Sequence, residues 1–161
     1  MNNDFLQLLL LIIIANGAPI IFARLLSDSF DLAVDFGQQL PDNKPVFGAS
    51  KTWRGVIAAL CATALTAWLL GYAPATGIWV AVYAVVGDLF SSFVKRRLSM
   101  PSSSMAPLLD QVPESLLPAY MMMELFGLDA LAVILLVLTF IILELGLSFI
   151  LYRWGVRKRP F

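Results

Sequence analysis

The sequence predicts an all-α, polytopic membrane protein of about five transmembrane helices, in a single membrane domain that covers residues 1–161. Hydrophobic residues make up 60% of the chain, well above their share in soluble globular domains. They are gathered into long uncharged runs, and about 20 such residues suffice to cross the hydrocarbon core of a bilayer. Most charged residues lie in polar segments between alternate runs, as expected of loops on one side of a membrane.

The first helix is expected at about residues 5–25. Its run from Phe5 to Ala23 is uncharged and no basic residue precedes it, so we expect a retained membrane helix and not a signal peptide. Pro19 lacks an amide hydrogen and loosens the helix around Asn16. Two interpretations remain open for this stretch: a packing kink, or a place where Asn16 faces a polar cavity.

Two further helices are expected at about residues 55–72 and 75–97. The stretch 55–87 holds 33 uncharged residues, too many for one helix in an ordinary bilayer, so the chain must fold back near Gly71. The polar stretch 26–54 is expected to be a loop. Ser50 near its end is a candidate N-cap for the helix that follows.

The last two helices are expected at about residues 112–128 and 130–152, after a second loop at 98–111 that is rich in proline and serine. The 17 residues of the first helix span roughly 26 Å, which barely crosses a bilayer. The first of these helices carries Glu124, and the second carries one acid, Glu144. Both carboxyls can be protonated or hydrogen-bonded between helices, and a role in an ion path is the alternative.

All 11 basic residues fall on one side of this arrangement. Because cytoplasmic loops carry the excess of lysine and arginine, the N-terminus is expected outside, and the C-terminus and the loops 26–54 and 98–111 in the cytoplasm. We therefore expect a multi-pass protein of the cell membrane whose active face is cytoplasmic. The basic residues are Arg24, Lys44, Lys51, Arg54, Lys95, Arg96, Arg97, Arg153, Arg157, Lys158 and Arg159.

Asp88 is the residue around which the candidate chemistry is arranged. It follows an uncharged hydrophobic run, and an acid at membrane depth is costly enough to indicate function. On a helix, Asp88 shares one face with Ser91, Ser92 and Lys95. This face combines a carboxylate, two hydroxyls and a cation, which can hold a metal and a phosphate together.

Asp110 adds a second carboxylate on the same side of the membrane. Carboxylates without histidine or cysteine suit Mg²⁺, whose coordination substrate phosphates typically complete. The chain has no histidine, and its only cysteine, Cys61, lies in an apolar run, which excludes imidazole catalysis and an intrachain disulfide. A phosphate-handling enzyme, a transporter with a basic collar and an assembly subunit remain open. The cations available for phosphate are Lys51, Arg54, Lys95, Arg96 and Arg97.

Several motifs lie in order between residues 15 and 111. The most specific are Lys51-Thr52-Trp53-Arg54-Gly55 and Ser92-Phe93 followed by Lys95-Arg96-Arg97; the others are Ala15-Asn16 with Pro19, Asp35-Phe36-Gly37, Gly48 with Ser50, Gly87-Asp88 and Leu109-Asp110-Gln111. Together they resemble the CDP-archaeol synthase family, small membrane cytidylyltransferases related to the CDP-diacylglycerol synthases.

The resemblance implies a five-helix fold and a Mg²⁺-dependent reaction of CTP with a lipid phosphate. The products would be pyrophosphate and a CDP-activated lipid, either CDP-archaeol-like or CDP-diacylglycerol-like. Carried over by motif, Asp88 and Asp110 are metal ligands and catalytic residues together with Lys95. Membrane lipids are further expected partners and nucleic acid is not. The residues expected to bind substrate are Asn16, Lys51, Arg54, Ser92, Lys95, Arg96 and Arg97.

The chain departs from the family pattern at two places. In the family pattern, an acid usually stands two residues after the glutamine that corresponds to Gln111. In this chain Pro113 takes that place, and the next acid is Glu114. Ala33-Val34 replaces the usual Pro-Ile before Asp35. A catalytically inactive paralogue that binds nucleotide or phospholipid is therefore an alternative, and a small transporter is another. Apolar helices offer the same surroundings to ether-linked and ester-linked tails, so both lipid classes, like monomer and oligomer, stay open.

The predicted orientation can be tested with a reporter that is active only outside the cytoplasm. Fused to the C-terminus of the full chain, this reporter is expected to stay silent in intact cells, because the 11 basic residues segregate to one side. Fused to the N-terminus, it is expected to be active. The reverse pattern would contradict the orientation.

Overall fold

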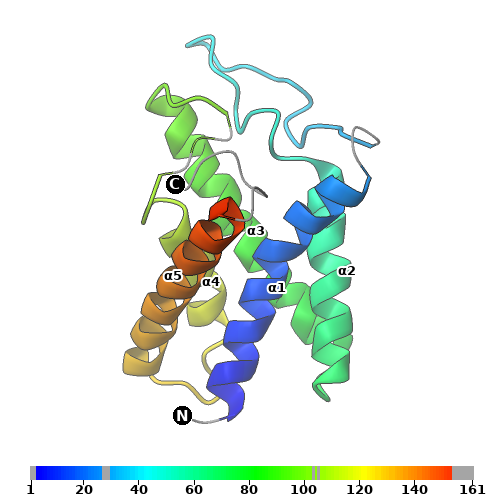
Figure 1. Cartoon of the computed structure of the whole chain (residues 1–161), viewed down its shortest axis with the longest axis vertical. Coiled ribbons are helices and arrows are strands. Elements are labelled where there is room, and N and C mark those ends of the chain that lie inside the picture. The colour runs from blue at the N-terminus through cyan, green and yellow to red at the C-terminus, as the bar shows by residue number, and fades with distance from the viewer. Residues whose placement is uncertain (1–2, 27–29, 103, 105, 154–161) are drawn as a thin grey trace.

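The computed structural model describes residues 3–26, 30–102, 104 and 106–153. Within them the chain forms five α-helices and no strand longer than an isolated bridge, which confirms the all-α prediction. The helices stand side by side in one bundle (Figure 1). They are α1 (Asn3–Leu25), α2 (Trp53–Leu69), α3 (Pro74–Arg97), α4 (Gln111–Met121) and α5 (Ala130–Arg153).

The main difference from the predicted bounds is the end of α4. The sequence predicts a helix over 112–128, whereas the structure ends α4 at Met121. The Met122 amide closes the last turn on the Pro118 carbonyl at 3.0 Å, and the following residues form turns up to Gly127. Gly127 has a φ of 59°, a left-handed conformation that interrupts a helix. The loops accordingly run over 26–52 and 98–110.

Three of the helices, α1, α3 and α5, are long and apolar enough to cross a membrane, by length and composition, in the described part of the chain. The apolar helix α2 has 17 residues. Helix α4 has 11 residues and a length of about 16 Å, roughly half of a hydrocarbon core. Five helices are thus present as predicted, but α4 is too short to span a membrane.

The start of α2 is fixed by Thr52, and the prediction of Ser50 as N-cap is wrong. Thr52 has an extended backbone, and its side chain accepts a hydrogen bond from the Gly55 amide at 3.3 Å. The preceding residue is held in a short antiparallel pairing, because the Val34 amide donates to the Lys51 carbonyl at 2.8 Å. This pairing keeps the chain extended beyond Ser50, so a helix cannot start there.

The two loops lie at one end of the bundle, together with the C-terminal ends of α1, α3 and α5 (Figure 1). We call this the loop end. All basic residues that the structure describes lie in these segments or in the first turn of α2. The turns that join α2 to α3 and α4 to α5 lie at the opposite end and have no basic residue. Three of the 11 basic residues, Arg157, Lys158 and Arg159, lie outside the described residues, so their predicted side is not tested.

Two glycines of α3 allow its neighbours to approach closely. A Cβ atom at Gly77 would overlap the Thr63 carbonyl of α2, and one at Gly87 would overlap the Pro113 carbonyl of α4. Only a residue without a side chain fits such contacts. Because Gly87 precedes Asp88, the contact places the start of α4 directly against the part of α3 that carries this acid.

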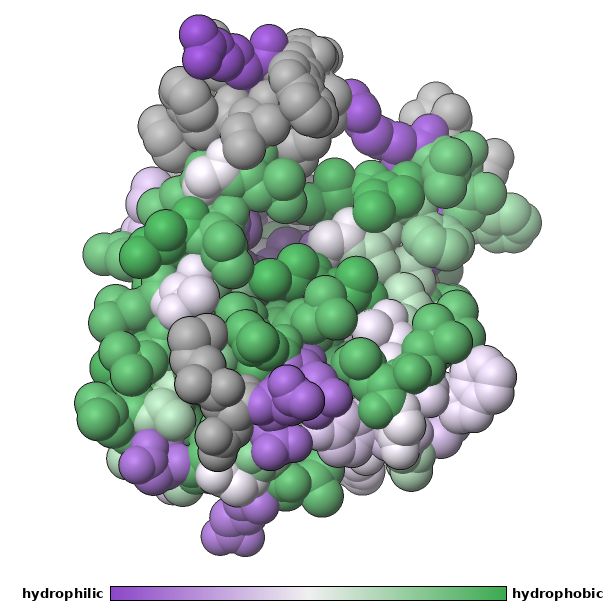
Figure 2. Space-filling view, turned by 60° about the horizontal axis from the view of Figure 1, so that its bottom comes forward, coloured by the Kyte–Doolittle hydropathy of each residue, from purple (hydrophilic) through white to green (hydrophobic). Residues whose placement is uncertain are grey.

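The half of the bundle away from the loop end is filled by apolar side chains. Leu8 and Leu11 of α1 are fully buried there and belong to one cluster with Leu136 of α5. Small residues such as Ala59 and Ala81 pack between the helices nearer the loop end. Apolar residues also cover most of the outer face visible in Figure 2, which suits a surface in contact with lipid.

Replacing Gly87 by alanine is expected to destabilise the protein, because the added methyl group overlaps the Pro113 carbonyl and must push α4 away from α3. Overpacking of this kind typically costs about 1–3 kcal/mol. The measurement is thermal unfolding of the purified chain in detergent micelles. Gly146→Ala is the matched control, since a Cβ there meets no atom within 4 Å. Equal melting temperatures for the two variants would contradict the close contact.

Candidate active site

A polar cavity of about 1070 Å³ opens among the helices at the loop end. Its volume lies at the upper end of the usual range for small-molecule sites, about 300–1000 Å³. All five helices and both loops contribute to its wall. Of the predicted site residues, only Arg97 is absent from the wall. The charged and amide residues of the wall are Asn16, Arg24, Asp31, Lys51, Arg54, Asp88, Lys95, Arg96, Asp110, Gln111, Glu114 and Glu144.

Asp88 pairs with Lys51 from the loop 26–52. The Lys51 Nζ atom lies 2.6 Å from each carboxylate oxygen of Asp88, and both side chains are partly exposed to the cavity. The partner of Asp88 is therefore not on its own helix. Ser91, predicted on the same face, is not part of the cavity wall, and its Oγ donates to the Asp88 carbonyl at 2.9 Å.

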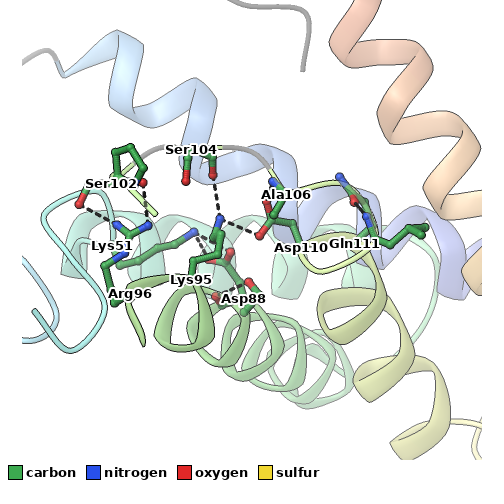
Figure 3. Close-up of polar contacts among 12 residues, drawn as sticks. Lys51, Asp88, Lys95, Arg96, Ser102, Ser104, Ala106, Asp110 and Gln111 are labelled. Carbon is green, nitrogen blue, oxygen red and sulfur yellow. Dashed lines mark hydrogen bonds and ion pairs between the residues drawn. The ribbon is translucent and has the colours of Figure 1, made fainter. Parts of the chain in front are cut away.

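Asp110 forms the second ion pair, with Lys95 of α3 (Figure 3). The Lys95 Nζ atom lies 2.7 Å from Asp110 Oδ1 and donates to the Ser104 carbonyl at 3.0 Å. The other oxygen, Oδ2, accepts a hydrogen bond from the Ala106 amide at 2.9 Å. The Lys95 side chain is 8% exposed and that of Asp110 is 15% exposed, so this is a largely buried pair. It ties α3 to the start of α4.

The guanidinium of Arg96 is held by the loop 98–110. Its Nη1 atom donates to Ser102 Oγ at 2.8 Å, and its Nη2 atom donates to the Pro101 carbonyl at 2.7 Å. Gly48 of the other loop touches the same group, since a Cβ there would lie 3.1 Å from Arg96 Nη1. Gly48 has a φ of +95°, which also favours glycine. Both loops therefore meet at Arg96.

Arg97 points away from the cavity and fastens the loop 26–52 to the end of α3. Its Nη1 atom lies 2.6 Å from both carboxylate oxygens of Asp42, and its Nη2 atom donates to the carbonyls of Lys44 and Pro45. The guanidinium also lies over the Phe93 ring, 5.2 Å from its centre. The structure thus does not bring Arg97 together with the other predicted phosphate ligands.

The remaining predicted residues line the cavity with different partners. Arg54 Nη2 lies 3.2 Å from a carboxylate oxygen of Asp31. Asn16 donates from Nδ2 to the Ile12 carbonyl at 3.0 Å, which leaves its Oδ1 atom available to the cavity. Ser92 is buried on α3, between the positions of Asp88 and Lys95. Of the two interpretations of the stretch around Asn16, the one with a polar cavity agrees with this arrangement.

Asp35 organises the loop 26–52. Its buried carboxylate accepts hydrogen bonds from the amides of Gly37 at 3.0 Å and of Phe47 and Gly48 at 2.9 Å. Burial acts to raise the pKa of Asp35, but the backbone hydrogen bonds from Gly48, Phe47 and Gly37 outweigh it and leave the pKa below its ordinary value of 3.8. Asp35 thereby fixes the segment that leads to Lys51.

Five charged or amide residues of the wall were not predicted as site residues: Arg24, Asp31, Gln111, Glu114 and Glu144. Gln111 is fully buried, Glu114 is 6% exposed, and Glu144 reaches the cavity from α5. Gln111 and Glu114 stand three residues apart and therefore on one face of α4. A polar pair at this spacing in an apolar segment is a signal that could have found them.

The donor set fits a hard divalent cation that shares its coordination with a bound ligand. Asp88 and Asp110 present carboxylate oxygens to one cavity, and Mg²⁺ is typically held by one or two carboxylates together with substrate phosphates. Among the described residues, no group of three or more histidine, cysteine or acidic side chains could hold a metal ion without such help. Phosphate oxygens would therefore have to complete the site.

Apolar outer faces around a cavity of paired lysines, arginines and carboxylates are the features of a membrane protein that can hold phosphate groups. A family model for CarS-like CDP-archaeol synthase matches residues 73–161. A CDP-archaeol synthase of Pyrobaculum calidifontis is 38% identical over 136 residues, 77% of this chain and 78% of that protein. One of Pyrobaculum aerophilum is 30% identical over 158 residues, 92% of each. The chain belongs to the CDP-archaeol synthase family and is an enzyme of the cytidylyltransferase class.

The fold agrees with this assignment. A solved structure described as an intramembrane enzyme for archaeal membrane lipids biosynthesis superposes with a TM-score of 0.75 and 28% sequence identity, over 88% of this chain and 90% of that one. The resemblance inferred from the motifs between residues 15 and 111 is therefore confirmed, and so is a multi-pass membrane protein.

Replacing Asp35 by asparagine is expected to loosen the loop 26–52, because three backbone amides lose a charged acceptor. We expect hydrogen exchange at the Phe47 and Gly48 amides to become roughly tenfold faster at neutral pH. The folded pKa of Asp35 lies below 3.8, so its stabilising effect is fully present above this value and is lost as the pH falls through the folded pKa. The difference between the variant and the natural chain should then vanish at the lowest pH.

The amides of α5 serve as the internal control for this experiment, since Asp35 has no hydrogen bond to that helix in the described part of the chain. Unchanged exchange at Phe47 and Gly48 at neutral pH would show that Asp35 does not hold the loop.

Proposed function

We propose that this protein transfers the cytidylyl group of CTP to an archaeol-type lipid phosphate, with Mg²⁺ as cofactor, and forms a CDP-lipid and pyrophosphate. The observation that supports this proposal is one cavity that contains Lys51, Lys95 and Arg96 together with the carboxylates of Asp88 and Asp110. The names of the relatives support the ether-lipid class over the ester-linked one.

In the proposed reaction an oxygen of the lipid phosphate attacks the α-phosphorus of CTP. A new P–O bond forms, the bond from the α-phosphorus to the bridging oxygen breaks, and pyrophosphate leaves with that electron pair. A phosphate monoester is already anionic near pH 7, so no general base is required. The lack of histidine in the chain is then no obstacle. Such transfers depend mostly on alignment and on neutralisation of charge.

The cations of the wall would bind the phosphates. Lys51 and Lys95 each hold a carboxylate, and Arg96 holds loop acceptors, so phosphate oxygens would compete with these partners for the same hydrogen bonds. Charge-assisted hydrogen bonds to phosphate are strong, and an arginine adds a planar pair of donors. Arg54 and Ser92 would add further contacts, whereas Arg97 is assigned to holding the loop.

Asp88 and Asp110 would hold Mg²⁺ when it is bound, and the cation would neutralise charge on the phosphate oxygens of the substrate. The two carboxylates enter the site from different elements, α3 and the end of the loop 98–110.

The active face is assigned to the cytoplasmic side of the cell membrane. The cavity lies at the loop end, where the described basic residues also lie, and such residues are concentrated on the cytoplasmic side. CTP would enter from that side. The lipid phosphate would keep its chains among the apolar outer faces of the helices while its head group reaches the cavity.

The direct test is incubation of the purified chain with labelled CTP, Mg²⁺ and a panel of lipid phosphates, followed by identification of the lipid that acquires CMP. Archaeol-type phosphate is expected to be labelled with release of pyrophosphate, and ATP in place of CTP is expected to give little product. Binding of CTP without transfer to any lipid would favour the inactive paralogue to which Pro113 points. Equal turnover of ATP would refute the proposed nucleotide.

Replacing Asp88 or Asp110 by asparagine is expected to lower turnover by about a hundredfold or more, because each change removes a ligand charge at constant volume. The measurement is kcat with CTP and lipid phosphate at limiting Mg²⁺. Asp129→Asn is the matched control: Asp129 belongs to the turn that joins α4 to α5, away from the cavity wall, its Oδ1 atom caps the Ala132 amide at 2.7 Å, and asparagine caps as well. Normal turnover in both site variants would contradict the assignment.

A further inference from the structure

The start of α4 presents a buried amide to the cavity that has a donor to spare. The side chain of Gln111 is fully buried, and its Oε1 atom accepts a hydrogen bond from the Leu108 amide at 2.7 Å. This bond fixes the orientation of the amide, because a backbone N–H can only face the oxygen. The Nε2 atom is left without a hydrogen-bond partner among the described residues, although Gln111 belongs to the cavity wall.

Glu114 stands beside this donor on the same face of α4. Its side chain is 6% exposed, and within the described ranges its carboxyl group makes no hydrogen bond or ion pair. The acids Asp31, Asp88 and Asp110 of the wall differ from it, since each pairs with a lysine or an arginine. Residues at a spacing of three in a helix are neighbours, so the free donor and the free acceptor lie next to each other.

Both groups are costly as they stand. A buried donor without a partner destabilises the folded protein, and a buried carboxyl without a partner destabilises it more. The structure keeps both in the wall of one cavity, where a ligand can complete them. Such a ligand must offer a hydrogen-bond acceptor to Gln111 Nε2 and, next to it, a hydrogen-bond donor to the Glu114 carboxyl group.

The position of the pair favours a base over a phosphate. The cations that suit phosphate lie on the other side of Asp110, and Figure 3 shows Gln111 beyond Asp110 from Lys95 and Arg96. Glu114 lies near the acids Glu144, Asp88 and Asp110 as well as near Lys51. A carboxyl group offers a phosphate no positive charge, whereas a glutamate oxygen readily accepts a hydrogen bond from the exocyclic amine of cytosine.

We propose that Gln111 and Glu114 bind the pyrimidine ring of the nucleotide, with Gln111 Nε2 donating to the ring N3 atom and Glu114 accepting from the exocyclic 4-amino group. This inference rests on the proposed function, which brings a nucleotide into the cavity, and it assigns the choice of base to α4. Uracil presents N3–H at the position of the cytosine N3 acceptor, so its N3–H group faces the Gln111 Nε2 donor and no hydrogen bond can form there.

The sharpest test exchanges the two residues. The double variant Gln111→Glu with Glu114→Gln keeps side-chain size and net charge but reverses donor and acceptor. We expect the ratio of kcat/KM for CTP to that for UTP to fall by about tenfold or more, because each base contact discriminates by roughly that factor. Binding of CTP and UTP, measured by calorimetry on the full chain, should change in the same direction.

Two single variants support the exchange in case the double variant folds poorly. Gln111→Met removes the donor from a side chain of similar length and should also lower the preference for CTP. Ser115→Ala is the matched control: Ser115 is buried one turn along α4 and donates to the Gln111 carbonyl at 2.6 Å, away from the base. It can lower stability but should leave the CTP to UTP ratio unchanged.

The outcomes separate this inference from the proposed function. If the natural chain makes a CDP-lipid but the exchanged and Gln111→Met variants keep its CTP to UTP ratio, the assignment of the base to α4 is wrong and the proposed function stands. If the natural chain binds CTP over UTP, loses this preference on exchange and transfers CMP to no lipid, the inference holds and the proposed function fails.

Discussion

Charge placed inside an apolar bundle has to be paired, and this constraint shapes the loop end of the protein. The Lys51–Asp88 pair joins the loop 26–52 to α3, and the Lys95–Asp110 pair joins α3 to the start of α4. Removing one member of such a pair leaves an uncompensated charge in poorly solvated surroundings. The groups suited to bind phosphate and metal are therefore also the groups that connect the walls of the cavity.

The long loop acts as a wall of the site more than as a cover over it. Asp35 gathers three of its backbone amides, Arg97 fastens it to the end of α3, and Gly48 rests against Arg96. Within this loop, the Val34 amide donates a hydrogen bond to the Lys51 carbonyl and so holds the backbone that carries the Lys51 side chain. A segment that is polar and irregular in sequence is thus held at several independent points.

Much of this arrangement can be read from the sequence, because uncharged runs, breaks at glycine and proline, and the distribution of basic residues report directly on helices and their common end. Helical spacing also identifies Asp88 as a site residue. It does not identify its partner, since spacing orders residues along one helix and says nothing about the loop that supplies Lys51. For the same reason Arg97 looks equivalent to Arg96, although consecutive helical residues point in different directions. The end of α4 depends on a left-handed Gly127 that hydropathy does not register.

The short α4 has a consequence for the membrane as an electrical barrier. A polar cavity that enters the bundle from one side thins the insulating layer, and ions would leak if the remaining depth were wet. That depth is occupied by the turns after Met121, whose Phe126 and Leu128 pack with Leu8 of α1 in the apolar cluster. Their backbone amides are bonded within the turns, as non-helical chain at membrane depth requires. The apolar cluster thus separates the charged cavity from the opposite end of the bundle.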